Sequence, residues 1–147
     1  MAVRILVVDD HEIVRRGLRG LLETQPRWQI IGEAANGRDA VEKAAALCPD
    51  MVILDISLPG DGLEAARRIL QALPQTEVLI LSYHDSPFMV RRALDAGARG
   101  YVLKSDAGHD LLAAVEAVSQ HKPFLSPAVA QGVAGARDRH WGDCVSG

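Results

Sequence analysis

The sequence predicts a doubly wound α/β fold, in which helices cover both faces of a five-stranded parallel sheet. Short apolar runs recur along the 147 residues, and each is bounded by Gly, Pro or polar residues. Patterns of helical period fill the intervals between these runs, and such alternation is typical of parallel sheets. Right-handed crossovers leave few topologies, of which 2-1-3-4-5 is the commonest for five strands.

The central strand is the most informative of the five expected strands. Four apolar residues from Met51 lead directly into Asp55, and a Pro/Gly turn follows. A short continuous apolar run between breakers is typical of a strand buried on both faces. An acid at its last position emerges at the carboxyl end of the sheet, where ligands bind in open α/β folds. The expected strands are Val3–Val8, Trp28–Ala34, Met51–Asp55, Glu77–Ser82 and Gly100–Leu103.

Five amphipathic segments are expected to be the covering helices. Apolar residues recur on one face of each segment, and Pro, Gly or cap residues mark the ends. The result is a flavodoxin-like (βα)5 order. The expected helices run from Glu12 to an end marked by Pro26, from Arg38 to Leu47, from Leu63 to Leu73, from the Ser86-Pro87 pair to just before Gly97, and from Asp106 to Gln120.

The domain organisation follows from the length of this pattern. Residues 1–121 form one domain, and residues 122–147 are expected to be a linker-like tail. The first part of the tail, from Lys122 to Gln131, reads as either a short docking segment or a linker. The remainder is glycine-rich without useful periodicity, and we expect it to be poorly ordered.

Composition narrows the function only broadly. The net charge of −3 argues against general attraction to nucleic acid or to an anionic membrane. No apolar run approaches the length of a membrane span, and no signal peptide precedes the first strand. Cys48 and Cys144 form neither a disulfide framework nor a metal-ligand spacing. We therefore expect a cytoplasmic protein with reduced thiols.

The chemistry-bearing residues lie at the ends of four expected strands. Asp9 and Asp10 follow the first strand, Asp55 ends the third, Ser82 ends the fourth and Lys104 follows the fifth. Three carboxylates in one crevice repel one another, so the site needs a cation, and ligation by oxygen alone suits Mg²⁺. A carboxylate nucleophile, a divalent metal, a hydroxyl and an ammonium together indicate phosphoryl transfer.

Each of these residues also has an ordinary structural explanation. An acid pair after a strand is often a helix cap, and a lone acid or hydroxyl is often a turn residue. A lysine at a strand end often extends its charge to solvent. His11 and His84, which lie in strand-to-helix loops, are interpreted as solvated histidines. The combination at four strand ends is what favours a functional site.

At these residues the sequence resembles the receiver domain of two-component response regulators. The resemblance extends from Arg4 to about Gln120. The phrases D-D-H-E-I-V-R-R-G-L, A-L-D-A-G-A-R-G-Y-V-L-K and F-L-S-P-A-V-A are similar to the NarL/LuxR-type subfamily. Such regulators accept a phosphoryl group from a sensor histidine kinase and, in relatives, regulate transcription. The resemblance thus implies a self-phosphorylating and self-dephosphorylating switch and not a turnover enzyme.

The resemblance also implies a role for each site residue. Asp55 corresponds to the phosphoacceptor, and Asp9 and Asp10 to the acidic pair that binds Mg²⁺, with Asp9 acting through water. The backbone carbonyl of Ser57 corresponds to a further metal ligand. The remaining positions are Ser82 as the hydroxyl, Lys104 as the family's lysine and Tyr101 as the aromatic switch residue. An ordinary half-buried strand aromatic remains the alternative for Tyr101.

Two departures from the family pattern bear on function. NarL/LuxR-type regulators continue into a helix-turn-helix domain, whereas the residues after Gln131 are too few and too glycine-rich for one, so we expect no DNA binding by this chain itself. A homodimer through the fourth helix, fifth strand and fifth helix is a possible assembly. The loop Leu58 to Gly62 is one residue shorter than the family pattern, which puts the metal geometry in question.

Three other functions were weighed against the receiver. An aspartate-nucleophile phosphatase would alternate its acids as D-x-D after the first strand, whereas Asp9 and Asp10 are adjacent. A flavin- or nucleotide-binding protein would cradle phosphate in a Gly- or Ser/Thr-rich first loop, which is acidic here. The third is a pseudo-receiver that the short loop prevents from being phosphorylated and that acts as an interaction module; it is the runner-up.

Overall fold

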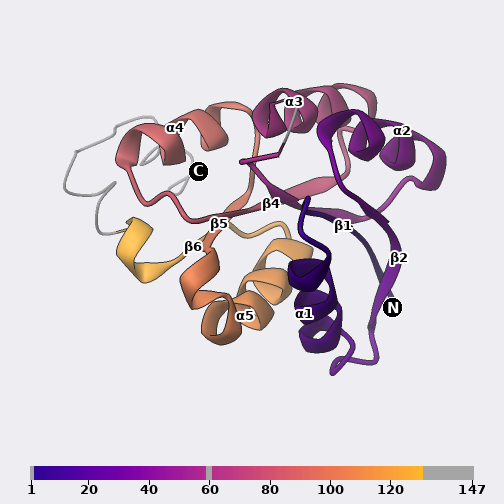
Figure 1. The fold of residues 1–147 in the computed structure, drawn as a ribbon, viewed down its shortest axis with the longest axis horizontal. Helices are drawn as coiled ribbons and strands as arrows, with labels where there is room; N and C mark the ends of the chain where they lie inside the picture. Colours follow the sequence, from indigo (N-terminus) through magenta and orange to yellow (C-terminus); the bar gives the residue numbers. More distant parts are fainter. Residues whose placement is uncertain (1, 59–60, 131–147) are drawn as a thin grey trace.

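The computed structural model describes residues 2–58 and 61–130 and contains a parallel sheet of order β2-β1-β3-β4-β5-β6 (Figure 1). Helices connect the successive strands from β1 to β5. The strands are β1 Val3–Val8, β2 Trp28–Ala34, β3 Met51–Asp55, β4 Glu77–Ser82, β5 Gly100–Leu103 and β6 Phe124–Leu125. The helices are α1 Glu12–Leu22, α2 Gly37–Leu47, α3 Gly62–Ala72, α4 Pro87–Asp95, the 3₁₀ turn η1 Lys104–Asp106 and α5 Ala107–Ser119.

The helices form two layers around the sheet. Figure 1 shows α2, α3 and α4 on one face and α1 with α5 on the other. Alternate residues of each strand enter two separate apolar clusters, because successive side chains of a strand point to opposite faces. The central strands β3 and β4 are buried along their whole length. The predicted doubly wound fold and the strand order 2-1-3-4-5 are therefore confirmed.

The predicted strand bounds agree with the structure, and most helix bounds differ by one or two residues, whereas α1 ends at Leu22, some way before Pro26. Helix α2 begins at Gly37 because the side chain of Asn36 accepts a hydrogen bond from Asp39 N at 2.8 Å. Helix α3 begins at Gly62 for a similar reason, since Asp61 caps it. None of the helices in residues 2–58 and 61–130 has the length and apolar character needed to cross a membrane.

A sixth strand was not predicted. Strand β6 runs parallel to β5, with Gly100 opposite Phe124. The following Ser126 and Val129 are buried, and Val129 belongs to the apolar cluster on the side of the sheet that α2, α3 and α4 cover. The described part of the segment after Lys122 therefore docks on the sheet, which was one of the two alternatives for it. The domain boundary at 121 stays a prediction, and the tail from 131 to 147 lies outside the described residues.

Candidate functional site

The two buried acids of the site follow neighbouring strands. Val8 pairs with Leu54 in the parallel register, so Asp9 and Asp55 come next on β1 and β3. Both residues continue the strand face that packs on α1 and α5. Both are almost fully buried, at 0% and 1% exposed. Burying two unprotonated carboxylates side by side is costly unless a cation balances them.

Lys104 provides that cation from the turn after β5. Its Nζ lies 2.8 Å from Asp9 Oδ2 and 2.9 Å from Asp55 Oδ2. The ammonium donates a hydrogen bond to Asp55. Its contact with Asp9 is an ion pair without hydrogen-bond geometry, and Asp9 Oδ2 has no hydrogen-bond donor among the described residues. One ammonium therefore serves two carboxylates, and Asp9 Oδ2 has an ion pair but no hydrogen bond within the described part of the chain.

The electrostatics of Lys104 reflect this arrangement. Burial alone would lower the pKa of Lys104, but the two facing carboxylates of Asp9 and Asp55 outweigh burial and raise that pKa above its usual value. The ammonium is therefore charged throughout the neutral range. A fixed positive charge beside a buried carboxylate can stabilise negative charge that develops on a group attached to that carboxylate.

The β1–α1 loop adds the side chains of Asp10 and His11 to the buried acids Asp9 and Asp55. Asp9, Asp10, His11 and Asp55 each offer one ligand atom, and these atoms lie within 4.8 Å of one another. Asp9 Oδ1 accepts a hydrogen bond from His11 N at 2.9 Å, and His11 Nδ1 lies 3.1 Å from Asp10 Oδ1. Three carboxylates, one of which has a buried oxygen without a hydrogen bond from the described residues (Asp9 Oδ2), fit a small hard cation such as Mg²⁺, which prefers oxygen ligands.

The β3–α3 loop returns tightly past the end of β3. Ser57 N donates to Asp55 Oδ1 at 2.9 Å, so it holds the carboxylate oxygen that Lys104 does not bond. A Cβ at Gly62 would lie 2.8 Å from the backbone oxygen of Asp55, so only glycine fits this approach. Asp61 has φ 67°, a left-handed conformation that is strained for a residue with a Cβ. Residues 59–60 of the predicted short loop lie outside the described part of the chain.

The predicted hydroxyl and aromatic residues lie on the other face of the sheet. Ser82 continues the face of Ile80, and Ile80 pairs with Tyr101 on β5. Tyr101 is fully buried, and its hydroxyl donates to the backbone oxygen of His84 at 2.6 Å. Burial raises the pKa of the Tyr101 hydroxyl, and a smaller opposing effect comes from Ser82. The prediction that Tyr101 acts as a switch is not tested by this geometry.

Sequence reasoning missed several contacts of the site. The exposed ring of Tyr83 lies 5.2 Å from Lys104 Nζ, within the range of a cation–π interaction. His11 is largely solvated, as interpreted, but it also contacts both loop acids. Arg15 donates to the backbone oxygen of Asp9. The position of His11 beside the acid pair was the one available signal, because the other two contacts join residues with no distinctive spacing.

The fold and the site define a flavodoxin-like α/β protein with a buried acidic pocket and a paired lysine at the carboxyl end of its sheet. The family model of the response regulator receiver domain matches residues 5–116. The chain belongs to this family of two-component signalling proteins. The predicted resemblance to a receiver domain is thereby confirmed.

Individual relatives support the same assignment. The response regulator protein VraR of Staphylococcus aureus is 39% identical over 130 residues, which cover 88% of this chain. The match spans 62% of the length of VraR. A two-component response regulator of the LuxR family from Aurantimonas sp. SI85-9A1 has 38% identity and a TM-score of 0.89, over 93% of this chain and 99% of that chain.

Two further structures are isolated receiver domains. The receiver domain of the putative response regulator NarL from Mycobacterium tuberculosis has 34% identity and a TM-score of 0.77, over 82% of this chain and 98% of that chain. The receiver domain of RcsB from Salmonella enterica serovar Typhimurium, solved with phosphomimetic BeF3−, has 27% identity and a TM-score of 0.84. It covers 90% of this chain and 99% of that chain.

Proposed function

We propose that the chain is a phosphoacceptor receiver that takes a phosphoryl group onto Asp55 from a phosphohistidine of a sensor histidine kinase. The observation that carries the proposal is the pairing of Asp55 Oδ2 with Lys104 Nζ at 2.9 Å, beside the second buried acid Asp9. A site with surplus negative charge and one fixed cation is suited to a ligand that brings a further cation and an anionic group together.

The transfer step forms one bond and breaks one. A carboxylate oxygen of Asp55 attacks phosphorus, a P–O bond forms and the P–N bond to the donor imidazole breaks. The imidazole leaves with the bonding electron pair and takes up a proton from water. Ser57 N holds Asp55 Oδ1 at 2.9 Å, which leaves the orientation of the attacking carboxylate fixed before the donor arrives.

The remaining site residues stabilise the product. Lys104 neutralises charge on the phosphoryl oxygens, and its raised pKa keeps it protonated. Asp9, Asp10 and Asp55 would hold Mg²⁺, with the backbone carbonyl of Ser57 as a further ligand. The metal would supply additional charge neutralisation at the phosphoryl group.

Ser82 and Tyr101 would carry the signal to the output surface. Ser82 is buried at the end of β4, and its Oγ accepts a hydrogen bond from His84 N at 2.9 Å. To donate its hydroxyl to the phosphoryl group, the Ser82 side chain would rotate away from His84 N, and the loss of that bond would shift the loop whose carbonyl holds Tyr101. Phosphorylation would then favour one of two arrangements of α4 and β5. In relatives this output regulates transcription.

A homodimer through α4, β5 and α5 is part of the same proposal. The edge of β5 is already paired with β6, so a dimer would use the exposed sides of α4 and α5. Phe88 on α4 is 69% exposed and supports a contact there. We also propose that the chain meets its kinase in the cytoplasm.

The test is the intact mass of the protein after incubation with Mg²⁺ and acetyl phosphate, compared with the Asp55→Asn variant. We expect a single phosphoryl adduct that requires Mg²⁺ and is absent from Asp55→Asn, because the amide lacks the nucleophilic carboxylate. An adduct formed by Asp55→Asn at the wild-type rate would show that another residue is the acceptor. No adduct from folded wild type, repeated with phosphoramidate, would favour the pseudo-receiver.

A further inference from the structure

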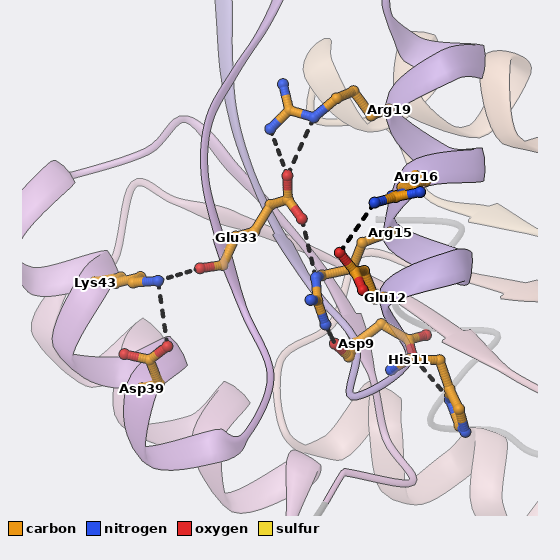
Figure 2. A network of polar contacts seen from close by, with 9 residues as sticks. All are labelled: Asp9, His11, Glu12, Arg15, Arg16, Arg19, Glu33, Asp39 and Lys43. Carbon is orange, nitrogen blue, oxygen red and sulfur yellow. Dashed lines mark hydrogen bonds and ion pairs between the residues drawn. The ribbon is translucent and has the colours of Figure 1, made fainter.

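Arg15 of α1 links the acidic pocket to the neighbouring strand β2. Its Nη1 donates to the backbone oxygen of Asp9 at 2.6 Å, and its Nε donates to Glu33 Oε1 at 2.9 Å. The side chain of Arg15 is largely buried, at 17% exposed. Figure 2 shows the guanidinium lying between the two partners. One planar, permanently charged group therefore holds the main chain of one strand against a carboxylate of the next.

Glu33 is a fixed anchor for this link. Arg19, one turn further along α1, donates to Glu33 Oε2 from Nη2 at 2.6 Å and from Nε at 3.1 Å. Lys43 of α2 donates to the backbone oxygen of Glu33 (Figure 2). The hydrogen bonds from Arg19 have the largest effect on the pKa of Glu33 and lower it. Burial opposes this effect, and the hydrogen bond from Arg15 adds to it, so the pKa of Glu33 is lowered. The carboxylate is thus charged and held by two arginines.

The bond from Arg15 falls on a sensitive peptide group. The carbonyl of Asp9 belongs to the peptide that joins Asp9 to Asp10, which are two of the three acids of the proposed metal site. The preceding amide is fixed as well, since Asp9 N donates to Ala34 O at 3.0 Å. Rotation of the Asp9–Asp10 peptide would change the directions of both carboxylates, and Arg15 opposes that rotation.

We infer that Arg15 is a positioning residue for Mg²⁺ binding, acting through the peptide that joins Asp9 to Asp10. The inference rests on the proposed function, because it assigns the pocket to Mg²⁺. Residues that orient metal ligands without touching the metal typically change its affinity by about 10- to 100-fold when they are replaced. Arg15 has the contacts for this role, since it fixes the ligand main chain and is itself fixed by Glu33.

Arg19 offers a matched control within the same helix. It pairs with the same carboxylate, so Arg19→Met and Arg15→Met each remove one guanidinium from Glu33. The bond to the Asp9 carbonyl belongs to Arg15. A purely structural brace predicts that both variants lose stability and keep their affinity for Mg²⁺. A positioning role predicts that Arg15→Met alone binds Mg²⁺ more weakly.

The experiment is a titration of the full chain with MgCl2, followed by the amide shifts of His11 and Ser57 in ¹⁵N spectra. We expect the Kd for Mg²⁺ to rise about 10-fold in Arg15→Met and to stay within about twofold of wild type in Arg19→Met. Arg15→Lys is expected to behave like Arg15→Met, because an ammonium cannot reproduce the two fixed bonds of a guanidinium. Circular dichroism at the titration temperature verifies that each variant is folded.

The outcomes separate this inference from the proposed function. An unchanged Kd in Arg15→Met, or equal losses in Arg15→Met and Arg19→Met, would overturn the positioning role while leaving the phosphoacceptor intact. No saturable effect of Mg²⁺ on wild type would overturn the inference, and the acetyl phosphate assay would then decide the proposed function independently. If Arg15→Met does not fold, Glu33→Gln replaces it, since the loss of the charged anchor should weaken Mg²⁺ binding in the same direction.

Discussion

At the amino end of the sheet one carboxylate has two nitrogen partners, whereas at the carboxyl end one ammonium has two carboxylate partners. Glu77 is buried and receives Arg99 Nε at 3.3 Å and His121 Nδ1 at 2.7 Å. Lys104 faces both Asp9 and Asp55, and one oxygen of Asp9 lacks a hydrogen bond among the described residues. The two ends therefore differ in charge balance. At the amino end the buried carboxylate of Glu77 has a nitrogen partner for each of its contacts, whereas the carboxyl end has more carboxylates than cations and thus surplus negative charge for a ligand to balance.

The largest effect is expected from removal of the shared ammonium. Lys104→Ala should slow formation of the phosphoryl adduct by about 100-fold or more, because it removes the charge that stabilises the phosphoryl oxygens. We expect Lys104→Ala to remain folded, with only a small change in its thermal unfolding midpoint, since Mg²⁺ can balance the charge of the facing acids. Timed intact-mass measurements and thermal denaturation, both in excess Mg²⁺, provide the comparison. A folded Lys104→Ala variant that retains the wild-type labelling rate would contradict our assignment of Lys104.

Neutralising one acid at each end should change stability in opposite directions. Without divalent cations, Asp9→Asn should raise the free energy of unfolding by about 1–2 kcal/mol, since Asp55 alone can balance Lys104. Glu77→Gln should lower it by about 1–2 kcal/mol, because the ion pair with Arg99 is lost and the contact with His121 Nδ1 is weakened. Urea unfolding in EDTA measures both values. Changes of the same sign would show that the two ends do not differ in the way we describe.

Tyr101 lies near the carboxyl end but has a complete hydrogen bond, so it should behave like a structural group. Tyr101→Phe should lower the free energy of unfolding by about 1 kcal/mol, since the bond to His84 O is lost. The pKa of Tyr101 is raised in the folded state, so its neutral form contributes stability below the unfolded pKa of about 10, and this is lost as pH rises further. Denaturation between pH 8 and 11 should show a steeper alkaline loss in wild type than in Tyr101→Phe.

The smallest effects are expected at two strained turns, one near each end of the sheet. Cys48 has φ 48° after α2, and its side chain adds only a weak bond from Sγ to Ala45 O at 3.7 Å, so Cys48→Gly should stabilise the protein by about 0.5–1 kcal/mol. Asp61 has φ 67° but also caps α3 by accepting from Leu63 N and Glu64 N. Asp61→Gly should therefore be close to neutral, because relief of strain and loss of the cap oppose each other. Chemical denaturation of both variants tests this difference.

The sequence was sufficient to predict the strands from β1 to β5 and the strand-end residues of the site. Continuous apolar runs mark buried strands of a parallel sheet strongly, and a charged residue at the end of such a run can only emerge at the sheet edge. The meeting of Asp9, Asp10 and Asp55 followed from the strand order. Whether these acids bind Mg²⁺ and whether Asp55 is phosphorylated stay predictions.

The features that the sequence did not indicate depend on contacts that produce no periodic pattern of residues along the chain. The bond from Arg15 to Asp9 joins a helix side chain to a backbone oxygen, and an arginine pair on an amphipathic helix is ordinarily solvated. Two residues, Phe124 and Leu125, are too few to show the alternation of a strand. The split of the site between the two faces, with Tyr101 opposite the acids, required the register that only the structure provides.

Strand β6 also has a consequence for how molecules of this protein meet. Without it, β5 would present a row of unpaired backbone groups, the kind of edge on which strands of other chains add and aggregates grow. Phe124 N donates to Arg99 O, Ser126 N to Tyr101 O, and Leu103 N to Ser126 Oγ, so these groups are occupied from within the chain. A strand of two residues and one serine hydroxyl thus shields this border of the sheet from intermolecular β-pairing, and association is directed to side chains on the helices.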